Sequence, residues 1–316
     1  MVNLIVHQLK QTNPELLPPD ANTVDAIRHA NISAEYKRDI LDTIWREAGP
    51  ERLLSIGQGT REVRYDPIWH AVRSVSPAVA FDKWRRFEAF GHSRNRLRID
   101  QTHEKRASFQ RYIVDGGTPT SPENLLICGL TIAILKETGC LGLRCEMPLD
   151  DGTTYCIHKN GHFFIPDDPN ALTTATWTIE WKSFSRRMES TIPETEPPDI
   201  LLPRSCDSIL RASIEAVVRL LKYDVARQWK VGELAREAGL STRSLQRRLR
   251  DAELSFSLLV RLVRIHEACR LLKNSNAPIT TIGFCAGFSD SAHLSRDFHA
   301  SMGMTPSDYR AVWQSA

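Results

Sequence analysis

The chain has 316 residues, 41% of them hydrophobic and 25% charged, a composition that excludes a disordered or fibrous protein and suggests about two globular domains. Its longest apolar stretch, residues 125–135, is shorter than the roughly 20 residues that a membrane-spanning helix requires, so we expect no membrane contact. Seven cysteines without framework spacing, and no secretory signal at the start, predict reduced thiols and a cytoplasmic location.

The net charge of +3 is distributed unevenly. Residues 204–316 carry 17 Lys and Arg against 11 Asp and Glu, a net of +6, whereas residues 1–203 carry 24 against 27, a net of −3. A basic region attracts polyanions such as nucleic acid. An ordinary solvated basic surface explains the charge equally well, so charge alone decides nothing.

The N-terminal part of the chain mixes predicted helices with predicted strands. Helices are expected over residues 34–48, 77–90 and 121–137. Serine at or before the start and glycine after the end bound each of them. Alternation of apolar and polar residues predicts strands over residues 96–100, 108–114 and 176–184. Because no regular βαβ rhythm appears, we expect residues 1–188 to form an α+β domain for ligand sensing or dimerisation.

A proline-rich segment follows this domain. Residues 189–203 have the sequence ESTIPETEPPDILLP, whose four prolines prevent a helix and whose pattern supports no long strand. We therefore expect a semi-stiff linker over residues 189–203 and a second domain over residues 204–316.

The second domain is predicted to be helical throughout. Helices are expected over residues 207–223, 232–238, 242–250 and 255–273, with another after Pro278. The polar residues of the long helix form only a narrow stripe: Ser257, Arg261, Arg264, Glu267 and Arg270. A helix that is apolar over most of its girth must pack on two sides, so we expect it to join two small bundles.

A short pattern occurs twice in this domain. Six of its residues recur 48 positions later as the same or similar types: Leu234, Ala235, Ala238, Gly239, Leu240 and Ser241 as Ile282, Gly283, Ala286, Gly287, Phe288 and Ser289. After one inserted residue, Leu245 and Leu249 recur 49 positions later as Leu294 and Phe298. Each copy predicts a helix, a sharp turn at glycine and a second helix. This is a helix-turn-helix unit, which typically places its second helix in the major groove of DNA.

The first unit carries the stronger DNA-binding face. Gly239 would supply the left-handed turn, Ser241 would cap the second helix, and Leu245 and Leu249 would point into the core. The opposite face carries Arg243, Gln246, Arg247 and Arg250. Arginine matches guanine edges and glutamine matches adenine edges, each worth roughly 1–3 kcal/mol of discrimination. An exposed arginine-rich helix explains the charge, but not the turn, the cap and the repeat together.

The second unit has a plainer face. Leu294 and Phe298 are expected to point inward, and the outer residues are Ser291, Ala292, Ser295 and Arg296. Because few of these side chains are long and polar, we expect more dependence on phosphate contacts and DNA shape. Gly283 inside the preceding helix costs roughly 0.5–1 kcal/mol relative to alanine, so this unit is expected to be the less stable one.

The spacing of the two units suits joint binding. The 19 residues over 255–273 would form a helix about 28 Å long. Successive major-groove segments on one face of DNA lie about 34 Å apart. With the width of the units added, one chain could reach adjacent turns without forming a symmetric dimer.

Residues 204–316 resemble the DNA-binding domain of AraC/XylS-family transcriptional regulators. The motifs are LAREAGLSTRSLQRRLR, EACRLLKNSNAPI, AGFSDSAHLSRDF and GMTPSDYR. The resemblance implies seven helices and base contacts at Arg243, Gln246 and Arg247 and at the four outer residues of the second unit. Gly283 and Val231-Gly232 depart from the family pattern. The upstream region resembles the family's sensor regions only faintly, which identifies no ligand.

The family resemblance also sets the expected partners. We expect a transcriptional regulator, typically an activator, that binds double-stranded DNA and RNA polymerase. We also expect an unidentified small-molecule effector at the N-terminal domain and no cofactor; a homodimer is left open. No P-loop, GxSxG or HExxH motif predicts a catalytic site. A DNA-repair methyl acceptor is the enzymatic alternative, although its cysteine cluster and Pro-Cys-His-Arg motif are missing.

Three other groups could bind a ligand. Cys156, His158 and His162 could hold zinc given a fourth ligand, which would make a metal-responsive regulator; Asn160-Gly161 instead predicts a hairpin with exposed histidines. The basic run over residues 92–98, with Lys105, Arg106 and Arg111, could bind an anion, although a solvated strand pair is favoured. The aromatic residues that could line a pocket, but more simply form core, are Trp84, Phe87, Tyr112, Phe163, Trp177 and Trp181.

Overall fold

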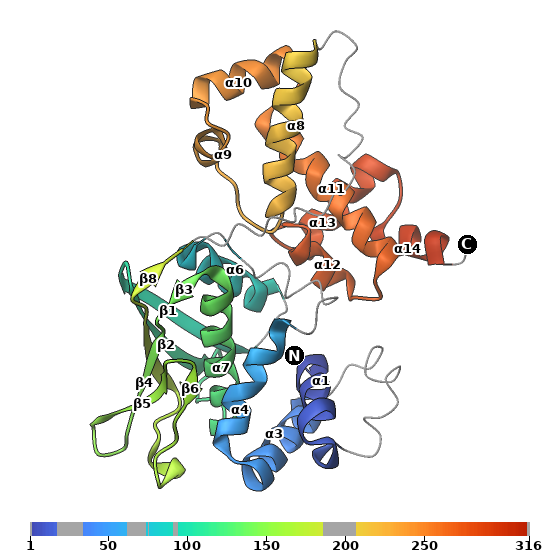
Figure 1. Cartoon of the computed structure of the whole chain (residues 1–316). Helices are drawn as coiled ribbons and strands as arrows, with labels where there is room; N and C mark the ends of the chain where they lie inside the picture. Colours follow the sequence, from blue (N-terminus) through green and yellow to red (C-terminus); the bar gives the residue numbers. More distant parts are fainter. Residues whose placement is uncertain are drawn as a thin grey trace. The chain divides into compact units, whose positions relative to one another are not determined.

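The computed structural model describes residues 2–17, 34–61, 74, 76–90, 94–185 and 207–314. The chain divides into two compact units, Met1–Arg187 and Met188–Ala316 (Figure 1). The predicted linker over residues 189–203 lies outside the described residues. In the described ranges, none of the helices combines the length and the apolar character that a bilayer span requires.

The described part of the N-terminal unit contains a six-stranded antiparallel sheet in the order β1-β2-β7-β4-β5-β6. Its strands are β1 (Asn95–His103), β2 (Arg106–Ile113), β4 (Arg144–Pro148), β5 (Thr154–Lys159), β6 (His162–Phe163) and β7 (Thr176–Glu180). A two-stranded sheet pairs β3 (Cys140–Leu141) with β8 (Ser183–Phe184). These sheets and the accompanying helices confirm the predicted α+β class.

The predicted strand over residues 176–184 is wrong in its extent. Strand β7 ends at Glu180, and β8 belongs to the other sheet. The backbone N–H groups between them have separate partners: Trp181 donates to the carbonyl of Lys105 at 3.0 Å, and Lys182 donates to that of Leu141 at 2.9 Å. Because these hydrogen bonds lead to different sheets, one alternating segment becomes two strands.

Helices cover one face of the large sheet (Figure 1). The helical elements of this unit are α1 (Val2–Thr12), η1 (Pro14–Leu16), α3 (Ala34–Ala48), α4 (Pro50–Ile56), η3 (Gly57–Arg61), α6 (Pro77–Phe90), α7 (Ser121–Thr138) and η4 (Pro169–Ala171). The three predicted helices are thus confirmed. Pro50, shortly after the end of α3, begins α4, because proline at the first helical position loses no intrahelical hydrogen bond.

Helix α7 forms the centre of the N-terminal core. A capping box of Thr120 and Glu123 opens it, and Gly139 ends it with a φ of 112°. Its residues are buried around almost the whole girth, as a continuous apolar sequence requires. Gly129 permits the close approach of α4, since a Cβ atom there would lie 2.1 Å from the carbonyl oxygen of Leu54.

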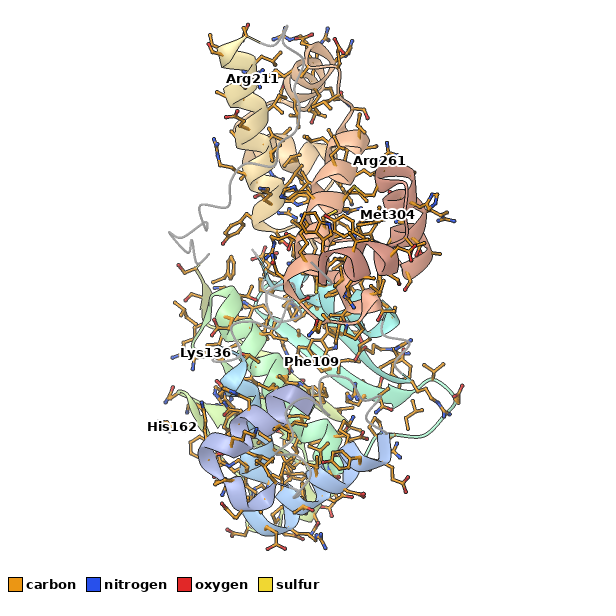
Figure 2. All side chains as sticks on the ribbon, turned by 90° about the vertical axis from the view of Figure 1, so that its right-hand side faces the viewer. Phe109, Lys136, His162, Arg211, Arg261 and Met304 are labelled. Carbon is orange, nitrogen blue, oxygen red and sulfur yellow. The ribbon has the colours of Figure 1, made fainter. Side chains whose placement is uncertain are left out.

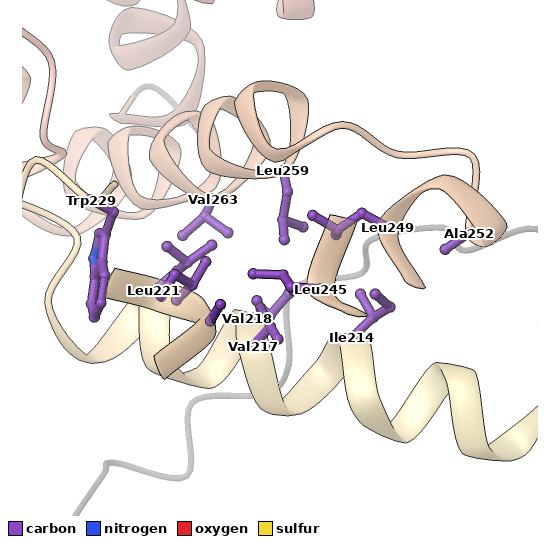
Figure 3. Packing of buried hydrophobic residues seen from close by; sticks show 12 residues of the cluster. Ile214, Val217, Val218, Leu221, Trp229, Leu245, Leu249, Ala252, Leu259 and Val263 are labelled. Carbon is purple, nitrogen blue, oxygen red and sulfur yellow. The ribbon is translucent and has the colours of Figure 1, made fainter. Parts of the chain in front are cut away.

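The described part of the C-terminal unit consists of seven helices, as expected. They are α8 (Ser208–Tyr223), α9 (Val231–Glu237), α10 (Thr242–Asp251), α11 (Phe256–Asn274), α12 (Ile279–Cys285), α13 (Ser291–Met302) and α14 (Pro306–Gln314). Helix α11 connects two clusters of buried side chains. It contributes Leu259 and Val263 to one (Figure 3), while Leu271 and Leu272 are buried further along it.

The first of these clusters is purely hydrophobic and holds the first helix-turn-helix unit together. Figure 3 shows Leu245 and Leu249 of α10 pointing toward side chains of α8 and α11. Leu245, Leu249 and Leu259 are each at most 1% exposed. Fully burying a leucine stabilises the fold by roughly 1.5–3 kcal/mol, so this cluster fixes the orientation of α10.

Candidate nucleic-acid interface

The first helix-turn-helix unit comprises α9 and α10. Gly239 ends the first helix with a φ of 68°, the left-handed backbone that the turn needs. Ser241 caps α10, its hydroxyl accepting a hydrogen bond from the amide of Ser244 at 3.1 Å. Because Leu245 and Leu249 are buried, the other side of α10 must face outward.

The outward face of α10 carries the predicted DNA-binding side chains. Arg243, Gln246, Arg247 and Arg250 are all exposed. Arg248 lies between them in sequence but has another role, because it donates a hydrogen bond to the hydroxyl of Ser213 on α8 at 2.6 Å. The structure thus separates an anchoring arginine from the exposed ones. The spacing of residues along the helix did not by itself place Arg248 on either face.

A buried arginine that sequence reasoning missed holds α9 in place. The guanidinium of Arg227 is ion-paired with Glu237 at 2.6 Å and with Glu233 at 3.0 Å. It also lies over the ring of Trp229, 4.0 Å from the centroid. The sequence signal for these ion pairs was the presence of two glutamates six and ten residues after an arginine. Only the folded structure shows that both glutamates contact this arginine.

The second unit comprises α12 and α13, with Gly287 in the turn at a φ of 85°. The inserted residue moves the helix cap from the serine position to Asp290, whose carboxylate accepts a hydrogen bond from the amide of His293 at 2.7 Å. This amide, followed by the hydroxyl of Ser289, holds the pKa of Asp290 below its ordinary value. The start of α13 therefore carries a negative charge.

The outward face of α13 is less polar than that of α10. Ala292, Ser295 and Arg296 are exposed and Ser291 is partly buried, while Leu294 and Phe298 are completely buried. The inward positions of both second helices are therefore confirmed. Within the C-terminal unit, α10 and α13 thus each have one buried face and one exposed face.

Helix α11 connects the two helix-turn-helix units in the chain. It has 19 residues, which corresponds to a length of about 28 Å. Its exposed residues include Arg261, which lies on the outer side of the helix (Figure 2), and Ser257. A buried helix with only a polar stripe at the surface agrees with the predicted connecting role.

The candidate metal ligands are not brought together. Asn160 and Gly161 form the predicted hairpin turn, with φ values of 53° and 86°. A bulge pairs His158 with Cys145 but Cys156 with Glu146, which turns Cys156 and His158 toward opposite faces of the sheet. His158 is buried, whereas His162 is exposed at the periphery of the unit (Figure 2).

No metal cluster replaces this one in the described part of the chain, where no three His, Cys, Asp or Glu side chains are placed to hold an ion. Two of the buried cysteines also lack the environment of a nucleophile. Burial raises the pKa of Cys140 to about 12 and raises the pKa of Cys145 as well. Thiols of this kind remain protonated at neutral pH and are unreactive.

The basic run of the N-terminal unit forms local pairs instead of one anion site. Arg94 contacts Asp115 at 2.6 Å, and Arg106 contacts Glu180 at 3.3 Å. Arg111 is buried and lies 3.3 Å from Glu88. Residues 91–93 lie outside the described ranges.

The aromatic candidates in the N-terminal unit mostly form core. Trp84, Trp177 and Trp181 are each at most 5% exposed, and the ring of Trp177 stacks on Phe109 at a centroid distance of 5.6 Å. Tyr112 differs, because it is 37% exposed at the surface of the sheet. These contacts favour the core interpretation over an aromatic pocket.

Known proteins match the C-terminal unit. Residues 234–311 match a family model described as a helix-turn-helix domain. The HTH-type transcriptional activator FapR of Escherichia coli is 26% identical over 118 residues, covering 37% of this chain and 45% of FapR. The porin thermoregulatory protein EnvY of Escherichia coli strain K12 is 30% identical over 104 residues, covering 33% of this chain and 41% of EnvY.

A solved structure of similar sequence is a transcriptional regulator from Chromobacterium violaceum described as containing an AraC-type DNA-binding domain. It is 23% identical and has a TM-score of 0.31, covering 33% of this chain and 95% of that one. The chain spans less than half the length of the curated relatives FapR and EnvY. Both relatives are described as regulatory proteins and not as enzymes, in line with the absence of a predicted catalytic motif. The C-terminal unit, with two helix-turn-helix motifs on a connecting helix, is therefore a helix-turn-helix domain of the AraC type.

Proposed function

We propose that this protein is a sequence-specific DNA-binding regulator of transcription. The observation that carries the proposal is the pair of helices α10 and α13, each buried on one face and exposed on the other within one unit. Such helices typically enter the major groove. They lie on either side of α11 in sequence, and this helix, about 28 Å long, approaches the length of one turn of DNA.

Helix α10 would supply most of the base recognition. Arg243 and Arg247 can each donate two hydrogen bonds to a guanine, and Gln246 can pair with an adenine. Arg250 lies one turn beyond Gln246 and is suited to a phosphate contact. The buried leucines and the Arg248–Ser213 hydrogen bond hold the helix that presents these groups.

Helix α13 would bind differently. Phosphates often bind the N-terminus of a helix, but here the carboxylate of Asp290 already occupies an amide and adds negative charge. Phosphate contacts are therefore expected further along the helix, at Ser295 and Arg296. Ser291 and Ala292 are small, which allows the backbone to approach the bases and favours recognition of DNA shape.

The N-terminal unit would regulate DNA binding. We propose that a domain over residues 1–188, joined by a linker over residues 189–203, binds a small-molecule effector or a second copy of the chain. A coupling free energy of about 1–3 kcal/mol between the two sites would suffice. RNA polymerase is the proposed downstream partner, and the cytoplasm remains the proposed location. A thermal-shift screen of the full chain against metabolites would detect the effector, because a ligand of the folded state raises the melting temperature.

Selection of duplexes from a random pool tests the DNA-binding proposal. The full chain should enrich a site with two short conserved segments. Arg247→Ala should weaken binding to that site by about fivefold to a hundredfold and relax the preference at one base pair. Arg219→Ala is the matched control, because Arg219 is an exposed arginine of α8 and lies on neither of the two second helices. Equal, weak binding to every duplex would refute the proposal.

A further inference from the structure

The turn of the second helix-turn-helix unit packs against the segment that precedes the first. The carbonyl of Gly287 accepts a hydrogen bond from the side-chain amide of Gln228 at 2.9 Å. A Cβ atom on Gly287 would lie 2.2 Å from the carbonyl oxygen of Val225. The equivalent Gly239 of the first unit has nothing within 4 Å of such an atom. Only the second turn, therefore, needs glycine for close approach as well as for its backbone angle.

The segment over residues 224–230 is itself fixed to the first unit. Arg227 is ion-paired with Glu233 and Glu237 of α9. Trp229 is buried in the first hydrophobic cluster, and its indole nitrogen donates to the carbonyl of Asp224 at 2.9 Å. Contacts between the second turn and this segment therefore also connect the second turn to α9.

Gln228 also contacts the connecting helix. Its side-chain oxygen accepts a hydrogen bond from the guanidinium of Arg264 on α11 at 3.1 Å. One side chain thus joins three parts of the unit: the segment fixed to α9, the connecting helix, and the turn before α13.

We propose that Gln228 is a positioning residue that fixes the distance and orientation of α13 relative to α10, and so sets the spacing of the DNA segments that the chain accepts. The connecting helix α11 by itself would fix how far apart the two helix-turn-helix units lie along its axis, but each unit could still rotate about its end of the helix. A second connection, away from that axis, removes this freedom. This inference rests on the proposed DNA-binding function.

The test measures tolerance to spacing. The site selected by the full chain is synthesised as found, and with one base pair added or removed between its two conserved segments. Affinity is measured by fluorescence anisotropy for the wild type, Gln228→Leu and Arg264→Met. Arg270→Met is the matched control, because Arg270 is on the same helix but bonds Glu267 within it. Circular dichroism checks that every variant is folded.

The wild type should lose about fivefold to a hundredfold in affinity when the spacing changes, the penalty typical of one mismatched base pair. Gln228→Leu should bind the original site about two- to tenfold more weakly, the effect of one hydrogen bond. When the spacing changes, the fold-loss of affinity in Gln228→Leu should be at least about threefold smaller than in the wild type, roughly the effect of one hydrogen bond. Arg264→Met should behave similarly, and Arg270→Met like the wild type.

Two results would overturn the inference while leaving the proposed function intact. One is sequence-selective binding by the wild type with no preference for spacing. The other is an equal loss on changed spacing in the wild type and in Gln228→Leu, which would make Gln228 a merely structural residue. Failure of the full chain to select any sequence would instead overturn the DNA-binding proposal and this inference with it.

Discussion

Gly239 and Gly287 occupy the same position in the two helix-turn-helix units but have different surroundings, so alanine should affect them unequally. Both have positive φ values, 68° and 85°. For an alanine, a left-handed backbone costs about 1–2 kcal/mol. At position 239 the new methyl group would meet open space, so Gly239→Ala should destabilise the first unit by about this amount alone.

At position 287 two further costs arise. The methyl group would lie 2.2 Å from the carbonyl oxygen of Val225, so the turn must move away. Overpacking of this kind costs typically about 1–3 kcal/mol. The displacement would also weaken the hydrogen bond between Gln228 and Gly287, worth about 0.5–1.5 kcal/mol. Gly287→Ala should therefore destabilise its unit by about 1.5–4.5 kcal/mol more than Gly239→Ala destabilises the first, from these two contributions together.

Hydrogen exchange with mass spectrometry on the full chain suits this comparison, because it reports opening free energies separately for different segments. Peptides from α12 and α13 should lose most protection in Gly287→Ala, and peptides from α9 and α10 in Gly239→Ala. Equal losses in the two variants would refute the argument that close approach distinguishes the second turn.

Three other changes test separate parts of the structure. Arg248→Ala should lower the free energy of unfolding by about 1 kcal/mol and leave base preference unchanged, whereas Arg250→Ala should weaken DNA binding at constant stability; urea unfolding and duplex titration separate the two. Arg296→Ala should reduce the slope of log affinity against log salt by about 1 without altering the selected sequence, as a lost phosphate contact does; an altered sequence would indicate base contact. Burial raises the pKa of Glu88, so the folded chain holds this proton more tightly than the unfolded chain. Its contribution to stability is therefore present at low pH and is lost as pH rises through the raised pKa, and Glu88→Gln should flatten the pH profile of urea unfolding; an unchanged profile would refute this assignment.

The sequence contained the information for the helices and for the inner face of each recognition helix. Leu245 and Leu249 are buried, as their spacing of four residues predicts, and the glycine and serine of the first turn act locally as expected. Such features depend on neighbours within a few residues. Local spacing and capping are therefore enough to predict them.

Other features depend on contacts between residues far apart in sequence, so they could be recognised only in the folded structure. The strand over residues 176–184 divides because Trp181 and Lys182 bond to Lys105 and Leu141. A bulge between two strands turns Cys156 and His158 apart, which removes the candidate metal site. The spacing of residues predicts neither the division of the strand nor the bulge, because each depends on which other strand pairs with the segment.

By itself, the sequence determined that two helix-turn-helix units exist, which faces of α10 and α13 point inward, and which polar side chains remain outside. Only the tertiary structure decided that Arg248 anchors α10 while Arg247 is exposed. It also decided that Gly287 packs against Val225 and Gln228, whereas a Cβ atom on Gly239 would meet open space. The physical reason is the distance in sequence over which each interaction acts. Periodicity and caps act within one helix, but the contact between Gln228 and Gly287, 59 residues apart, exists only once the helices have packed.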